Sequence, residues 1–144
     1  MNRIIHAVSI RAPRRRVYDA LATLQGLAGW WTTTVTGESA VGGTLAFRFA
    51  EVFKPDMRVD ELVSESLVRW TCVAGEPNWL DNVFSFELGD DGTMTGLMFR
   101  QDYARELDER TYGQYNYSWG YYLTSLKSLC ETGSGNPFGA PARP

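Results

Sequence analysis

The sequence predicts an α+β fold in which a curved antiparallel sheet wraps around a long C-terminal helix. Apolar residues alternate with a period of two through most of residues 42–99, which is typical of strands with one buried face. Short connections such as Asp90-Asp91-Gly92 join these segments, whereas parallel strands would need long crossovers. An amphipathic helix over about residues 112–131 follows, and it is the only element large enough to cover the apolar face of the sheet.

The N-terminal third predicts one strand and two short helices. Residues 3–11 alternate as a first strand, and Pro13 suits the first turn of a helix that carries Val17 and Leu21 on one side. Gly26 then interrupts the helical period, so we expect a second short helix over 24–31, and these two helices close one end of the sheet. The further strands are expected around residues 44–49, 57–61, 68–72, 82–88 and 95–99.

The 144 residues are a single-domain length, and we expect one domain over 1–138. Gly133 supplies a stop for the last helix. Residues 139–144 are rich in Gly, Pro and Ala, which predicts a flexible C-terminal tail.

The overall charge and the cysteines exclude several classes of function. A net charge of −3 gives no electrostatic reason to expect nucleic acid or an anionic membrane as a partner, and Arg14-Arg15-Arg16 is typical of a solvated helix face. Cys72 and Cys130 stand far apart without a CxxC or His-rich context, so we expect no metal and a reducing compartment. With no apolar signal core and no segment of about 18 apolar residues, the expected location is cytoplasmic.

Aromatic residues make up 13% of the chain, which is more than a small core needs and indicates a lined cavity as well as a core. For each single ring, packing within the core is the alternative to contact with a ligand. The rings expected to point inward are Phe47, Phe49, Trp70, Phe84, Phe86 and Phe99 from the strands, with Trp31, Tyr115, Trp119 and Tyr122 from the helices.

Three polar residues, Glu61, Asn82 and Asn116, also fall on predicted inward faces. A buried polar group needs a partner, so each is a candidate to bind the ligand. If Glu61 faces the cavity, desolvation raises its pKa and makes it the candidate general acid or base. The alternative is a strand bulge that turns Glu61 to solvent.

A catalytic constellation is not evident in the sequence. The single histidine, His6, lies on the first strand and fits a structural or surface role better than a triad. Gly42-Gly43 and Gly133 lack the spacing of a phosphate-binding loop, so no cofactor is expected.

Several segments together resemble a known family in their order and spacing. These segments are Ala12-Pro13, Val17-Tyr18-Asp19-Ala20-Leu21, Trp30-Trp31, Gly42-Gly43, Leu67-Val68-Arg69-Trp70, Gly92-Thr93, Trp119 with Leu123 and Leu126-Lys127, Glu131-Thr132-Gly133 and Asn136-Pro137-Phe138. The chain resembles the branch of activator of heat-shock-protein-90 ATPase-like proteins in the START and birch-pollen-allergen superfamily, also called SRPBCC. The resemblance implies a helix-grip fold with about seven strands, and a cavity between the sheet and the long helix.

The resemblance also implies three hypotheses of function. The leading one is binding of a hydrophobic or aromatic small molecule by a protein that is not a dedicated enzyme. The alternatives are a polyketide-cyclase or hydratase-type enzyme that uses the same cavity, and a module that activates a chaperone ATPase. Separately, Tyr117 and Tyr121 lie opposite Trp119 on the last helix, where exposed rings mark either a homodimer or partner surface, or a chance placement.

Overall fold

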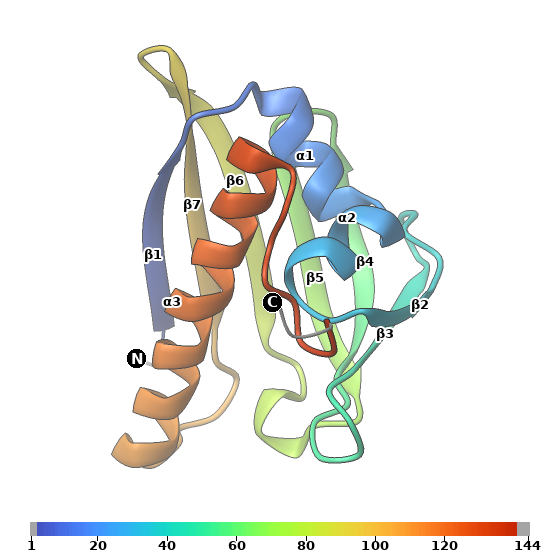
Figure 1. Ribbon diagram of the computed structural model, residues 1–144. Coiled ribbons are helices and arrows are strands. Elements are labelled where there is room, and N and C mark those ends of the chain that lie inside the picture. Colours follow the sequence, from blue (N-terminus) through green and yellow to red (C-terminus); the bar gives the residue numbers. More distant parts are fainter. Residues whose placement is uncertain (1–2, 141–144) are drawn as a thin grey trace.

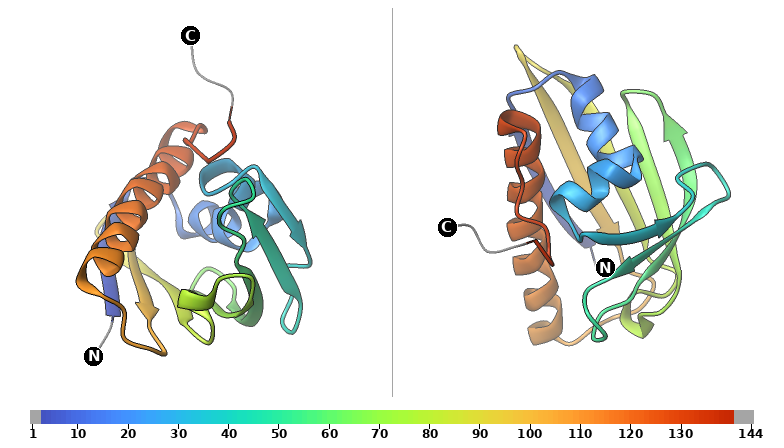
Figure 2. Two further views of the ribbon diagram at one scale, coloured as in Figure 1. Left: turned by 90° about the horizontal axis from the view of Figure 1, so that it is seen from below. Right: turned by 45° about the vertical axis from the view of Figure 1, so that its right-hand side comes forward.

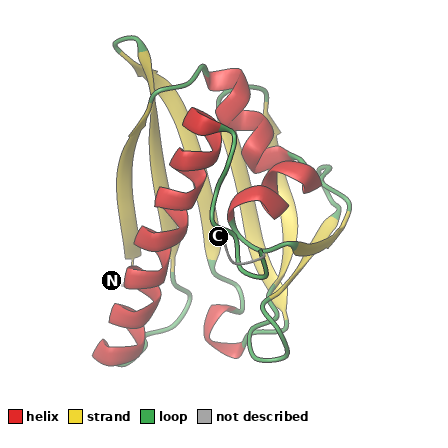
Figure 3. Ribbon diagram, viewed as in Figure 1, coloured by secondary structure: helices red, strands yellow, loops and turns green. Residues whose placement is uncertain are grey.

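The computed structural model describes residues 3–140 and confirms the predicted α+β helix-grip architecture (Figures 1 and 3). The elements in chain order are β1 (Arg3–Ile10), α1 (Arg14–Ala22), α2 (Leu24–Trp30), β2 (Thr34–Gly37), β3 (Thr44–Arg48), β4 (Asp56–Val63), β5 (Leu67–Ala74), the 3-10 helix η1 (Pro77–Trp79), β6 (Val83–Asp91), β7 (Met94–Asp102) and α3 (Glu109–Thr132). The predicted flexible tail falls largely on residues 141–144, which lie outside the described residues.

The seven strands form one antiparallel sheet in the order β1-β7-β6-β5-β4-β3-β2. Except for β1 and β7, which lie side by side, the neighbours in the sheet are consecutive in the chain, as the short predicted turns require. The sheet curves around the helices, with α3 beside β1 and with α1 and α2 further along the same face (Figure 2). This curvature leaves space between α3 and the β3–β4 side of the sheet, where the candidate site lies.

Strand β2 was not among the strands expected from the residues themselves, although the family resemblance implied a seventh. It has four residues, it pairs only with β3 at the edge of the sheet, and most of its side chains are exposed. A short edge strand with no buried stripe has no alternation to detect.

Helix α3 begins at Glu109, three residues before the predicted start. The Asp108 carboxylate accepts a hydrogen bond from the Thr111 backbone N–H, which is an N-cap arrangement. At the other end Gly133 adopts a left-handed conformation with φ 87°, and its N–H donates to the Leu129 carbonyl, as the predicted stop requires. The helix buries Trp119, Leu123, Ser125, Leu126 and Cys130 against the sheet and α2.

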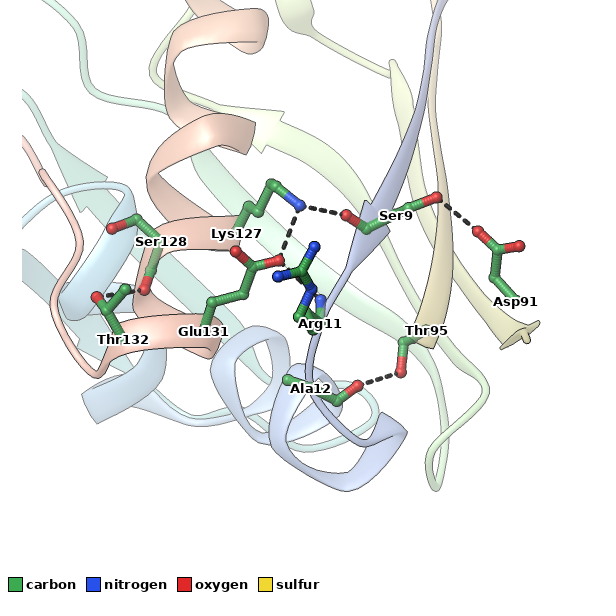
Figure 4. A network of polar contacts seen from close by, with 9 residues as sticks. All are labelled: Ser9, Arg11, Ala12, Asp91, Thr95, Lys127, Ser128, Glu131 and Thr132. Atoms are coloured by element: carbon green, nitrogen blue, oxygen red, sulfur yellow. Dashed lines mark hydrogen bonds and ion pairs between the residues drawn. The ribbon is translucent and has the colours of Figure 1, made fainter. Parts of the chain in front are cut away.

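A network of polar contacts fastens α3 to the end of β1 (Figure 4). The Lys127 ammonium donates to the Ser9 carbonyl at 2.6 Å and to the Glu131 carboxylate at 2.8 Å. The same carboxylate oxygen accepts from the Arg11 backbone N–H at 2.7 Å. The Lys127 side chain and the Arg11 N–H hold the pKa of Glu131 below its usual 4.5.

We expect Glu131→Gln to destabilise the protein only where the carboxylate is ionised. Because the pKa of Glu131 is lowered on folding, the stabilisation is complete above the unfolded value of 4.5 and is lost as the pH falls through the folded value. Urea unfolding of wild type and variant at several pH values measures the difference, with the exposed Glu106→Gln as control. A stability difference between wild type and variant that persists unchanged at pH 3 would contradict the ionised Glu131 carboxylate as its origin.

Candidate functional site

The candidate site is a cavity of about 290 Å³ between α3, the β3–β4 connection, η1 and the C-terminal segment. Eight of its nine lining residues are aromatic. The lining consists of Trp31, Phe49, Phe53, Trp79, Tyr115, Ser118, Trp119, Tyr122 and Phe138. An apolar lining with few polar groups is the usual composition of a small-molecule site.

Three indoles, Trp31, Trp79 and Trp119, form the buried side of the cavity. Each is 2% exposed, and their ring planes lie within 25° of parallel. The ring centroids are 5.2 Å apart for Trp31 and Trp119, 6.0 Å for Trp79 and Trp119, and 6.3 Å for Trp31 and Trp79. Rings fixed by one another in this way present a rigid wall, because no single indole can turn without displacing its neighbours.

Two irregular segments supply the outer wall. The backbone of Phe49 pairs with that of Phe53 across a tight connection in which Ala50 has φ 54°, and this brings the two rings to a centroid distance of 5.5 Å. On the other side the Phe138 N–H donates to the Trp31 carbonyl at 2.9 Å. The Phe138 ring then lies 5.5 Å from that of Phe49.

Polar groups lie next to the lining residue Tyr115. The Tyr115 hydroxyl accepts a hydrogen bond from the Asn78 amide at 3.3 Å and also hydrogen-bonds the Glu76 carboxylate. Partial burial raises the pKa of Glu76, and the Tyr115 hydroxyl and the Asn78 backbone N–H oppose that rise. A carboxylate of this kind, held beside an aromatic pocket, is a candidate proton donor or acceptor.

The structure brings five of the predicted ring residues to the cavity: Trp31, Phe49, Tyr115, Trp119 and Tyr122. The other five are buried in the core behind the lining: Phe47, Trp70, Phe84, Phe86 and Phe99, each 0% exposed. Strand parity places all of these rings on the inner face, but only the rings at the open end of the sheet border the cavity.

The three predicted polar residues do not line the cavity. A register shift between Val59 and Glu61 marks a bulge in β4, so Glu61 pairs with Arg69 on the outer face and forms an ion pair with it. The expectation that Glu61 faces inward is therefore wrong, and the alternative of a bulge is the observed one.

The two asparagines hold backbone and side-chain groups in place. Asn82 is fully buried, and its side-chain oxygen accepts from the Ala104 N–H at 2.8 Å. Asn116 is exposed, contrary to the predicted inward position, and its side-chain oxygen lies 2.9 Å from the His6 ring. This contact gives His6 a structural role between β1 and α3.

Four lining residues, Phe53, Trp79, Ser118 and Phe138, and the adjacent Glu76 were missed as site residues. Phe53, Glu76, Trp79 and Phe138 lie in loops, η1 or the C-terminal segment, to which no strand or helix period applies. The only sequence signal was the presence of large rings in segments rich in turn residues, such as Trp79 after Pro77.

The remaining reactive groups are inert or dispersed. Burial raises the pKa of both the Cys72 and the Cys130 thiol to about 11, so neither is a thiolate at neutral pH. Among residues 3–140, no three His, Cys, Asp or Glu side chains gather as metal ligands. In the same range, no helix is both long and apolar enough to span a membrane.

The fold and the pocket together define a helix-grip domain with an aromatic cavity between its sheet and its C-terminal helix. The family model described as "Activator of Hsp90 ATPase homolog 1-like protein" matches residues 11–131, and the chain belongs to this family. The resemblance inferred from the sequence is therefore confirmed.

Solved structures agree with this assignment. The Aha1 dimer from Colwellia psychrerythraea is 31% identical, with a TM-score of 0.84 over 94% of this chain and 100% of that one. Protein MLL2253 from Mesorhizobium loti is 21% identical with a TM-score of 0.77, covering 89% and 96% of the two chains. CalU16 from Micromonospora echinospora is 16% identical with a TM-score of 0.76, covering 93% and 69%. The last two show the shared fold alone, and a comparison with curated proteins gave no match.

Proposed function

We propose that this protein binds a hydrophobic or aromatic small molecule in the cavity between the sheet and α3. The observation that carries the proposal is the lining itself, in which eight of nine residues are aromatic and three indoles form a rigid wall. Rings that only filled a core would close on one another, whereas these surround about 290 Å³. Stacking and apolar burial against such a wall favour planar ligands.

Tryptophan fluorescence with planar aromatic probes tests this proposal, because three of the five tryptophans line the cavity. We expect saturable quenching with micromolar affinity, and we expect Ser118→Trp to abolish it by filling the cavity. Gln114→Trp, exposed on α3 and outside the lining, is the matched control and is expected to bind normally. Affinities no better than millimolar for all probes would contradict the proposal.

A second candidate is an enzyme of the cyclase or hydratase type, and the Glu76–Tyr115 pair specifically favours it. In this function the Glu76 carboxylate exchanges a proton with a substrate held against the rings. Glu61 has no part in it, because its ion pair with Arg69 lies on the outer face.

Replacing Glu76 by glutamine separates the two functions. We expect Glu76→Gln to retain binding of aromatic probes and to abolish any turnover that depends on proton transfer. Since burial raises the pKa of Glu76, ionisation weakens folding as the pH rises through that pKa. The variant is therefore expected to gain thermal stability relative to wild type at pH 7 but not at pH 4. Turnover that survives the substitution would remove Glu76 from the mechanism.

We also propose that the outer face of α3 binds a second copy of the chain. Tyr117 is 82% exposed and Tyr121 is 55% exposed, one helical turn apart, and the similar structure from Colwellia psychrerythraea is described as a dimer. Sedimentation at increasing concentration is expected to show a dimer for wild type and a monomer for Tyr117→Arg/Tyr121→Arg. A wild-type monomer at all concentrations would contradict this. Stimulation of an Hsp90 ATPase, lost in the same double variant, would instead assign the face to a chaperone.

A further inference from the structure

The eight aromatic rings of the lining surround the cavity from several directions, and we call them the aromatic cage. They are Trp31, Phe49, Phe53, Trp79, Tyr115, Trp119, Tyr122 and Phe138. The Phe53 ring stands at 88° to that of Trp79, with the two centroids 4.7 Å apart. The Phe49 ring stands at 69° to that of Trp31 and at 66° to that of Tyr122. Rings at such angles around one space form several walls rather than a single stack, so a bound group meets aromatic surface on more than one side.

The aromatic cage is suited to a positive charge. The face of an aromatic ring carries negative charge density and attracts a cation within about 6 Å of the ring centre. Tryptophan does so most strongly, and three Trp and two Tyr make up five of the eight rings. No Lys, Arg or His is among the nine lining residues, all of which lie in the described part of the chain. The cavity therefore has a cation-binding surface and no positive charge of its own.

A carboxylate lies next to the aromatic cage at Tyr115. The Asn78 side-chain amide donates to the Tyr115 hydroxyl at 3.3 Å, and this hydroxyl in turn donates to the Glu76 carboxylate. Burial raises the pKa of Glu76, and no basic side chain among residues 3–140 acts to lower it. Burial of a carboxylate is unfavourable unless a positive charge offsets it. Glu76 does not line the cavity, but its charge acts across the Tyr115 side chain and favours a cation inside the cage.

We propose that the ligand is an aromatic cation, bound with its charged ring against the faces of the aromatic cage. The inference rests on the proposed binding function and adds the charge of the ligand. The rings compensate for water that the cation loses, because cation–π attraction is strongest in a desolvated site. A neutral hydrocarbon gains apolar burial only, and an anion meets both the ring faces and Glu76 with the wrong sign. The cage therefore selects cations over neutral and anionic molecules of the same shape.

The matched probes 1-methylquinolinium and 1-methylnaphthalene test this selection, because they have the same shape and differ only in a positively charged ring nitrogen. The naphthalene is the more hydrophobic, so apolar burial alone predicts that it binds more tightly. In equilibrium dialysis we expect 1-methylquinolinium to bind wild type about tenfold more tightly. In Glu76→Gln this preference is expected to fall to about threefold or less. Glu87→Gln removes the same charge from the outer face of the sheet, where Glu87 pairs with Arg100 at 3.7 Å, and is the control that keeps the preference.

Absorption spectroscopy of 1-methylquinolinium bound to the wild-type protein gives a measurement that needs no variant. A quinolinium ring stacked on an indole face produces a charge-transfer band that neither ring has alone, and absence of this band overturns the proposal. Binding of 1-methylnaphthalene that is as tight or tighter overturns it while the binding function stands. An equal loss of preference in Glu76→Gln and Glu87→Gln also overturns it, because the net charge of the protein rather than the cage then attracts the cation. Absence of binding by both probes overturns the class of ligand and the aromatic binding function together.

Discussion

Trp31→Ala is expected to lower the free energy of unfolding by about 3–5 kcal/mol and to abolish binding of aromatic probes. The ring is 2% exposed, and its centroid lies within 6.3 Å of those of Trp30, Phe47, Phe49, Trp70, Trp79 and Trp119. Removing it leaves a void between the core and the cavity. The remaining two indoles of the wall then lose the ring that fixes their planes.

Chemical denaturation measures the change in stability, and fluorescence titration measures binding. The control is Val41→Ala in the loop between β2 and β3, an apolar residue that is 65% exposed, for which we expect a change of no more than about 0.5 kcal/mol. A loss below about 1 kcal/mol for Trp31→Ala would show that the neighbouring rings close the void. Retained probe affinity would show that the indole wall is not the binding surface.

Gly26→Ala is expected to be the second large effect, with a loss of about 3 kcal/mol. A Cβ at this position would lie 2.5 Å from both the Ala20 Cα and the Asp19 carbonyl oxygen, so α1 and α2 must move apart. That movement also lengthens the hydrogen bond that the Trp30 indole N–H donates to the Ala20 carbonyl, which is 2.9 Å in the wild-type structure. Because Trp31 follows directly after α2, the displacement also reaches the cavity wall.

Thermal and urea unfolding measure this loss, with Gly113→Ala as the control. Gly113 lies within α3, and a Cβ there meets no atom within 4 Å, so the same substitution is expected to stabilise by about 0.5–1 kcal/mol through helix propensity. Stability changes of opposite sign for Gly26→Ala and Gly113→Ala would identify the close packing of α1 against α2 as the cause of the loss at Gly26. A neutral Gly26→Ala would mean that α1 and α2 separate without cost.

Much of the fold was predictable because it depends on local patterns. The period-two alternation located the longer strands, and the short turns made the sheet antiparallel. Pro13 marked the start of α1 and Gly133 the end of α3, whereas the break between α1 and α2 falls at Thr23 and Gly26 lies within α2. What was missed has little local signal. Strand β2 is a four-residue edge strand, and the start of α3 depends on the Asp108 cap rather than on a hydrophobic stripe.

The candidate site was only half predictable, for a related reason. The alternation of side chains along a strand gives the face on which a ring lies, and each of the ten predicted rings either lines the cavity or is buried in the core behind it. It does not give the register, and one extra residue in β4 was enough to turn Glu61 toward Arg69 and solvent. The polar groups next to the cavity are instead Glu76 and Asn78, which contact the lining residue Tyr115 and lie in a connection without periodicity.

The sequence alone therefore determined the α+β class, the curved sheet, the covering helix and the aromatic character of the interior. These features depend on the chemistry of the residues and on their spacing along the chain. The tertiary structure decided which rings surround open space and which are buried in the core. Phe53, Trp79 and Phe138 are brought together from the β3–β4 connection, from η1 and from the C-terminal segment. Such a meeting depends on how distant segments pack against one another, and no local pattern of residues records it.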